Sequence, residues 1–150
     1  MSVFLRGPRV DVLASDAADP AFAAAREPWL LPAGAPAVDV DMDGEVSLVW
    51  APARGGKTGG SLALADVDWI ARRALLVAYL APGAPRDLAR EALALVVRYA
   101  QDELALERLD AQVRAGDAGT LAALAALGFV KEAERVDVVI CSRRVPVHPR

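Results

Sequence analysis

The pattern of apolar and polar side chains changes along the chain. The first half is dominated by short runs typical of strands, and the second half contains the longest helical pattern. Residues 3–13 alternate around a Gly-Pro break and predict an opening strand or strand pair. Residues 16–27 predict a short helix that an aspartate can cap, and Pro28 ends it. Three prolines and one glycine within residues 28–36 predict a loop.

The middle of the chain carries short apolar runs separated by glycine-rich turns, which predicts an antiparallel meander. The expected strands cover residues 38–42, 46–50, 61–67 and 73–80. Residues 51–60 contain Arg-Gly-Gly-Lys-Thr-Gly-Gly, which superficially resembles a phosphate-binding loop. Because that run leads into a strand rather than a helix, we interpret it as a flexible hairpin turn.

Residues 86–104 form the clearest amphipathic pattern and predict the longest helix. Leu88, Ala92 and Val96 recur on its apolar face, whereas Arg98 and Gln101 are expected on the polar face.

The rest of the second half predicts a strand at residues 108–114, a short helix at 118–127 closed by Gly128, and a buried strand at 136–142. Residues 143–150 read as a polar tail. This order predicts an α+β (mixed α/β) fold with one long helix against a mixed sheet. The length of 150 residues predicts a single domain, residues 1–150.

Composition excludes several classes of protein. A hydrophobic content of 55% excludes disorder through low hydrophobicity, and a net charge of -3 gives no attraction to nucleic acid or an anionic membrane. One cysteine, Cys141, and one histidine, His148, supply no ligand set for a structural zinc, so no metal is expected. The chain shows neither an apolar run of roughly 20 residues nor a signal-peptide pattern, which predicts a cytoplasmic protein.

Several segments, in order, match one known family. Residues 64–82 resemble the strand, turn and strand before its cofactor loop, and residues 88–93 resemble the start of the helix that follows. Residues 107–113 resemble its next strand, and residues 127–132 its Leu-Gly-Phe signature. The chain thus resembles the GNAT superfamily of N-acetyltransferases, most of all the branch that acetylates ribosomal-protein N-termini.

This resemblance implies a GNAT-like central mixed sheet flanked by helices. It also implies acetyl-CoA as acyl donor, a small-molecule or peptide primary amine as acceptor, and a possible homodimer. In this family the cofactor's diphosphate rests on N–H groups of a loop that leads into a helix, where the helix dipole favours negative charge. The loop pattern is Gln or Arg, two residues, Gly, one residue, then Gly or Ala.

The aligned loop, residues 84–89, departs from this pattern. Ala84 replaces the basic or amide residue, Pro85 lacks an N–H, and Asp87 stands in place of the glycine. We expect the Asp87 carboxylate to cap the helix and to repel the diphosphate, which Arg86 and Arg90 could offset from the side. A solvated first helical turn is the alternative interpretation of these three residues.

The resemblance further implies that the strand before the loop flanks the cofactor's pantetheine arm through main-chain groups, and that Asp117 stands where the family often has an Asn. The implied cofactor-binding residues are Tyr79, Leu80, Arg86, Asp87, Leu88, Ala89, Arg90 and Asp117. A half-buried strand tyrosine is the alternative interpretation of Tyr79.

Catalytic residues stay unassigned. Leu124 occupies the position of the family's proton-donating Tyr, and Leu75 that of a common carboxylate. Asp66 and Asp68 could receive an amine, although a turn role explains them as well. Only residues 131–135 separate Phe129 from the last strand, where relatives usually have a longer hairpin.

Three functions remain open. They are acetyl transfer to a primary amine, a binding or regulatory module that has lost catalysis, and the same fold recruited to other chemistry in a biosynthetic pathway.

Overall fold

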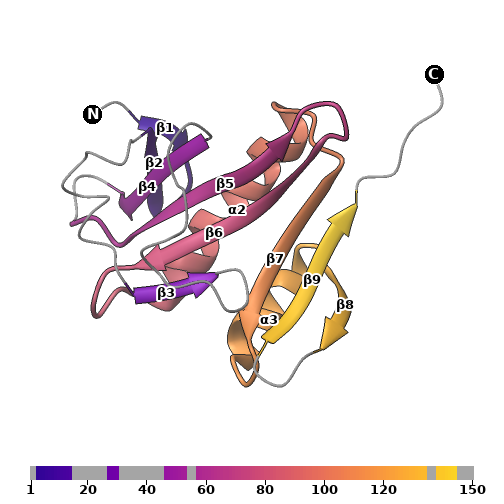
Figure 1. Ribbon diagram of the computed structural model, residues 1–150. Coiled ribbons are helices and arrows are strands. Elements are labelled where there is room, and N and C mark those ends of the chain that lie inside the picture. Colours follow the sequence, from indigo (N-terminus) through magenta and orange to yellow (C-terminus); the bar gives the residue numbers. More distant parts are fainter. Residues whose placement is uncertain (1–2, 15–26, 31–45, 54–56, 135–137, 145–150) are drawn as a thin grey trace.

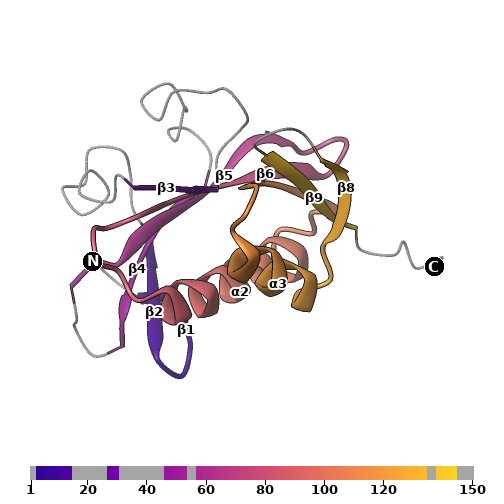
Figure 2. The same cartoon turned by 90° about the horizontal axis from the view of Figure 1, so that it is seen from below.

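The computed structural model describes residues 3–14, 27–30, 46–53, 57–134 and 138–144. Within these ranges the chain forms β1 (Val3–Arg6), β2 (Val10–Ala14), β3 (Glu27–Leu30), β4 (Val46–Pro52), β5 (Gly60–Asp68), β6 (Arg73–Leu80), α2 (Arg86–Asp102), β7 (Arg108–Arg114), α3 (Ala118–Ala126), β8 (Val130–Glu134) and β9 (Val138–Arg144). The strands build one mixed sheet in the order β1-β2-β4-β5-β6-β3-β7-β9-β8. The two helices lie on the same face of this sheet (Figure 1, Figure 2).

The predicted fold class and most of the predicted elements are confirmed. The opening strand pair is the hairpin of β1 and β2, and the expected meander is the antiparallel series β4, β5 and β6. The strand predicted at residues 108–114 is β7, which runs parallel to β6. The short helix is α3, and Gly128 follows it with a φ of 94°, a conformation that favours glycine.

The long predicted helix is α2, which ends at Asp102, two residues before the predicted end. Gln101 was expected on its polar face and is instead buried. The helix packs against β1, β2, β4 and β5, so a wider arc of its surface is covered than the apolar pattern alone indicates. Leu93 and Val97 are fully buried on this enlarged face.

Two strands were not predicted. β3 replaces the expected helix end at Glu27 and the expected loop at residues 28–30. Proline and glycine counts describe local preference, whereas β3 is held by pairing with β6 and β7 and by burial of Trp29 and Leu30. The connection expected at residues 131–135 contains β8, a fully exposed edge strand that pairs with β9 and shows no alternation.

The C-terminal boundary also differs from its prediction. Arg143 and Arg144 were assigned to a polar tail but belong to β9, where they pair with Leu109 and Arg108 of β7. The helix predicted at residues 16–27 and the strand at 38–42 lie outside the described residues, apart from Glu27. The same holds for residues 145–150 and for the middle of the turn at residues 51–60.

The main core lies between the sheet and the helices. Leu62, Leu76 and Leu109 are among its fully buried side chains, and Cys141 lies in it at 4% exposure. Burial raises the pKa of the Cys141 thiol, which agrees with its interpretation as a small core residue. A smaller cluster that includes Val77 and Tyr79 covers the opposite face of the sheet. Neither helix of the described ranges is long and apolar enough to cross a membrane.

Candidate functional site

The sheet opens between β6 and β7. The two strands are register partners only from Arg73–Arg108 to Leu76–Ala111. Beyond that point β3 lies between them, and its Leu30 pairs with both Ala78 of β6 and Val113 of β7. The opening is therefore filled, at its wider end, by a strand of the same chain (Figure 1).

This arrangement bears on two predicted cofactor residues. Tyr79 is the register partner of Pro28, and Leu80 that of Glu27. The Tyr79 side chain is on the face away from the helices, 7% exposed, and burial raises the pKa of its phenol. Strand β3 thus lies along the same edge of β6 that the resemblance assigns to the pantetheine arm.

The predicted loop lies at the start of α2, directly beyond the end of β6. Pro85 is the N-cap residue and its side chain makes no capping hydrogen bond. The first main-chain bond of the helix runs from Ala89 N to Pro85 O, at 3.1 Å. Ala89 is buried in the core and Leu88 packs against that core, so the two side chains hold the first turn on the sheet. The N–H groups of the first turn are the donors that a helix start offers to an anion.

Helix α3 begins close to this point. Asp117 caps it, with Oδ1 accepting from Thr120 N at 3.2 Å and Oδ2 accepting from the Thr120 hydroxyl at 2.7 Å. Arg86 Nη1 of α2 lies 3.8 Å from Asp117 Oδ2. The Arg90 guanidinium packs on Gly119, where an added Cβ would be 2.5 Å from Nη2. The structure therefore brings together Arg86, Arg90 and Asp117 between the starts of two helices.

A buried hydrogen bond joins β3 to the same region. Trp29 Nε1 donates to Thr120 Oγ1 at 2.8 Å, and Trp29 is 5% exposed. Since Thr120 in turn bonds to Asp117, the inserted strand and the α3 cap form one polar chain. Sequence reasoning missed Trp29, and the only signal was a large aromatic residue inside a proline-rich segment.

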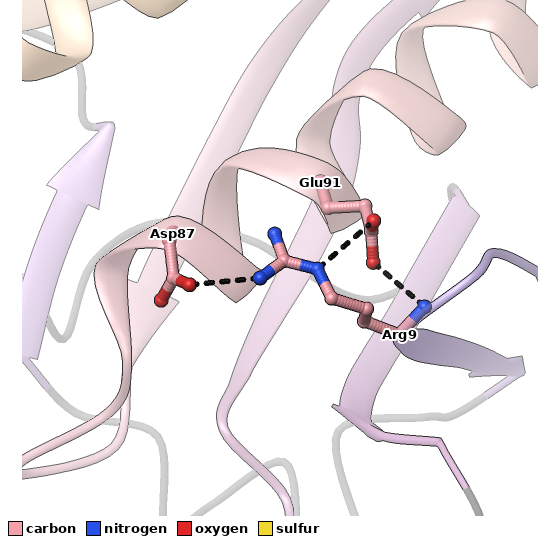
Figure 3. A network of polar contacts seen from close by, with 3 residues as sticks. All are labelled: Arg9, Asp87 and Glu91. Carbon is pink, nitrogen blue, oxygen red and sulfur yellow. Dashed lines mark hydrogen bonds and ion pairs between the residues drawn. The ribbon is translucent and has the colours of Figure 1, made fainter.

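The charge of Asp87 has a partner that the sequence did not indicate (Figure 3). Arg9, in the turn between β1 and β2, places Nη1 3.0 Å from Asp87 Oδ2. Its Nε lies 3.5 Å from Glu91 Oε1, and its main-chain N–H donates to Glu91 Oε2 at 3.1 Å. The hydrogen bond from Arg9 lowers the pKa of Asp87, and the N–H of Leu88 lowers it further. The expected capping of α2 by Asp87 is wrong, because Pro85 is the N-cap residue and Asp87 lies in the first turn of the helix, where its carboxylate pairs with Arg9.

Positions 75 and 124, where the family often has a carboxylate and a tyrosine, hold leucines in this chain. Leu124 is fully buried in the main core, and Leu75 packs on the smaller cluster on the opposite face. Asp68 Oδ1 accepts from Ile70 N at 3.0 Å and Ala71 N at 2.8 Å, as its interpretation as a turn residue requires. Among the described residues no three His, Cys, Asp or Glu side chains gather as a metal site.

The chain matches no protein-family model and no curated protein sequence. Solved structures do resemble it. The dodecameric structure of spermidine N-acetyltransferase from Vibrio cholerae in an intermediate state is 21% identical, with a TM-score of 0.60. The match covers 67% of this chain and 64% of that chain. Spermidine N-acetyltransferase from Vibrio cholerae in complex with CoA and spermine is also 21% identical, with a TM-score of 0.60 over 67% of this chain and 65% of that one.

The fold resembles that of these spermidine N-acetyltransferases. The predicted GNAT-like architecture is confirmed at the level of the fold, and the chain spans slightly less than two thirds of the length of these two enzymes. At this identity the likeness concerns the fold alone, because site residues vary freely on a conserved fold.

Proposed function

We propose that this protein is an N-acetyltransferase that transfers an acetyl group from acetyl-CoA to a primary amine. The observation that carries the proposal is the pair of helix starts beside the opening of an N-acetyltransferase-like sheet, with Arg86 and Arg90 between them. Main-chain N–H groups and two guanidiniums are suited to a diphosphate.

In the proposed reaction the amine nitrogen attacks the thioester carbonyl carbon, and the carbon–sulfur bond breaks. The amine loses a proton, and the departing thiolate of CoA gains one. With leucine at positions 75 and 124, catalysis rests on positioning the two reactants and on polarisation of the carbonyl by main-chain groups.

Every predicted cofactor residue except Asp87 has a role in this proposal. Arg86 and Arg90 contact the diphosphate, and Leu88 and Ala89 fix the turn whose N–H groups receive it. Asp117 pairs with Arg86 and so orients this guanidinium toward the diphosphate. The arm of the cofactor runs along β6 beside Tyr79 and Leu80, which requires β3 to move aside.

A second candidate is a binding or regulatory module without catalysis. The specific observation in its favour is β3, whose pairing with β6 and β7 already fills the opening. Such a module would use the exposed surface around the two helix starts without taking an acyl chain into the sheet.

The acceptor is proposed at the level of its chemistry. A polyamine is one class to test, since the solved structures that resemble this chain are named for spermidine. A peptide N-terminus is the other, in line with the sequence resemblance to the ribosomal-protein branch. We further propose that residues 1–150 act as one domain in the cytoplasm, as a monomer or a homodimer.

A thermal shift with acetyl-CoA tests the proposal first. A ligand at about a hundred times its dissociation constant stabilises the folded state by roughly 2.7 kcal/mol. We expect a clear rise of Tm with acetyl-CoA and then release of the CoA thiol when spermidine or a short peptide is added. A flat response at millimolar acetyl-CoA would overturn the enzyme proposal. A rise of Tm without thiol release from either class of amine favours the binding module.

A further inference from the structure

Arg9 connects the β1–β2 hairpin to the exposed side of α2. Its guanidinium pairs with Asp87 at 3.0 Å and with Glu91 at 3.5 Å, and its main-chain N–H also bonds to Glu91. Three contacts from one residue reach one helix face across about eighty positions of sequence. Figure 3 shows Arg9 lying across both carboxylates, on the first two turns of the helix.

The charges around the two helix starts are unbalanced without Arg9. Carboxylates outnumber guanidiniums among the five charged side chains that belong to the first two turns of α2 and the cap of α3, which are Arg86, Arg90, Asp87, Glu91 and Asp117. Arg9 makes the two kinds equal in number. The partial charge of about +0.5 at a helix start then decides the sign of the local potential.

We infer that Arg9 is a positioning residue for the acyl-CoA diphosphate, because its charge offsets part of the negative charge of Asp87 and Glu91 and so keeps the start of α2 attractive to an anion. This inference rests on the proposed function. It also explains how a loop with aspartate in place of glycine can still bind a diphosphate. Arg9, from the β1–β2 hairpin, reduces the repulsion expected from Asp87. The lowered pKa of Asp87 and the raised pKa of Arg9 both agree with a stable ion pair.

A purely structural role for Arg9 makes a different prediction. If Arg9 only holds the hairpin on the helix, its loss lowers Tm and affects CoA binding only through stability. If it acts through charge, the loss is repaired by removing the charge of Asp87, and it fades at high ionic strength.

The test compares CoA binding by Arg9→Gln, Arg9→Gln/Asp87→Asn and Arg6→Gln, measured by calorimetry with CoA itself and accompanied by Tm. Arg6→Gln is the matched control, because it removes the same charge from the same hairpin. The Arg6 side chain is 76% exposed, and its ion pair with Asp11 stays within the hairpin.

We expect Arg9→Gln to weaken CoA binding about three- to tenfold at low salt, the range for one unit charge several ångströms from a phosphate. The double variant should recover most of that loss, Arg6→Gln should bind as the unmodified chain does, and about 1 M salt should shrink the effect of Arg9→Gln.

Unchanged CoA binding by Arg9→Gln would overturn the inference and leave the proposed function standing. A loss that Asp87→Asn does not repair, or that high salt does not reduce, would overturn it as well. Failure of the unmodified chain to bind CoA at millimolar concentration would overturn the proposed function together with this inference.

Discussion

Single residues around the start of α2 have properties that their place in the sequence does not reveal. Asp87 looks like an uncompensated anion in the loop, yet it shares a hydrogen bond of 3.0 Å with Arg9. Gly119 looks like a weak point in a short helix, yet its missing side chain makes room for the Arg90 guanidinium. Both residues contact an arginine near the start of α2. Substitutions at these positions can therefore change cofactor affinity without lowering the free energy of unfolding.

Gly119→Ala tests the role of Arg90. The added methyl group would lie 2.5 Å from Arg90 Nη2, so the flexible guanidinium has to move. Alanine favours a helix over glycine by up to about 1 kcal/mol, so the free energy of unfolding should stay unchanged or rise. We expect acetyl-CoA affinity to fall about three- to tenfold, as for the loss of one charge-assisted contact.

Urea denaturation and calorimetry measure the two quantities for Gly119→Ala. Ala118→Ser is the control, because it changes the neighbouring exposed residue in the same helical turn. Unchanged acetyl-CoA affinity in Gly119→Ala would exclude Arg90 from the cofactor site.

Among the elements, β3 differs most from what its sequence indicates. Four residues with a proline have little tendency to form a strand alone, and a proline cannot donate to the ladder. Burial of Trp29 and Leu30 and the bond from Trp29 to Thr120 hold the segment in the sheet. The stability of β3 therefore comes from α3 and the neighbouring strands.

A double-mutant cycle on Trp29 and Thr120 measures this anchoring. Thr120→Val leaves the Trp29 N–H buried without its acceptor, which costs roughly 1–3 kcal/mol. Trp29→Phe removes the donor, so adding Thr120→Val to it should cost less by about 1 kcal/mol. Urea denaturation of the four proteins gives the coupling energy. Strictly additive costs would show that the hydrogen bond does not hold β3 to α3.

The whole molecule is built around a sheet whose one face is covered by α2 and α3 (Figure 2). Cys141 is the single cysteine of the chain and belongs to β9, where it lies in this core. The rate at which its thiol reacts therefore depends on whether the core is folded.

Labelling of Cys141 by a thiol reagent should follow global unfolding. Burial blocks access, and the raised pKa leaves less thiolate at any given pH, so both effects slow the native reaction. We expect slow labelling at pH 8 that accelerates in urea together with the loss of helical circular dichroism. Cys141→Ser gives the background. Fast labelling while the helical signal is intact would mean that β9 opens locally.

The sequence by itself determined the elements whose stability depends on nearby residues. Periodicity located the long helix, short apolar runs located β5 and β6, alternation located β7, and Gly128 marked the end of α3, because each of these signals depends on residues within one element. From these elements and their order the fold class followed.

Only the tertiary structure decided what meets at the candidate site. The insertion of β3, the approach of Arg86 to Asp117 and the ion pair of Arg9 with Asp87 join residues far apart in the chain. Such contacts depend on how whole elements pack, and local propensity carries no information about them. For that reason the sequence located the candidate cofactor loop, while the charge that compensates Asp87 became visible only in the folded chain.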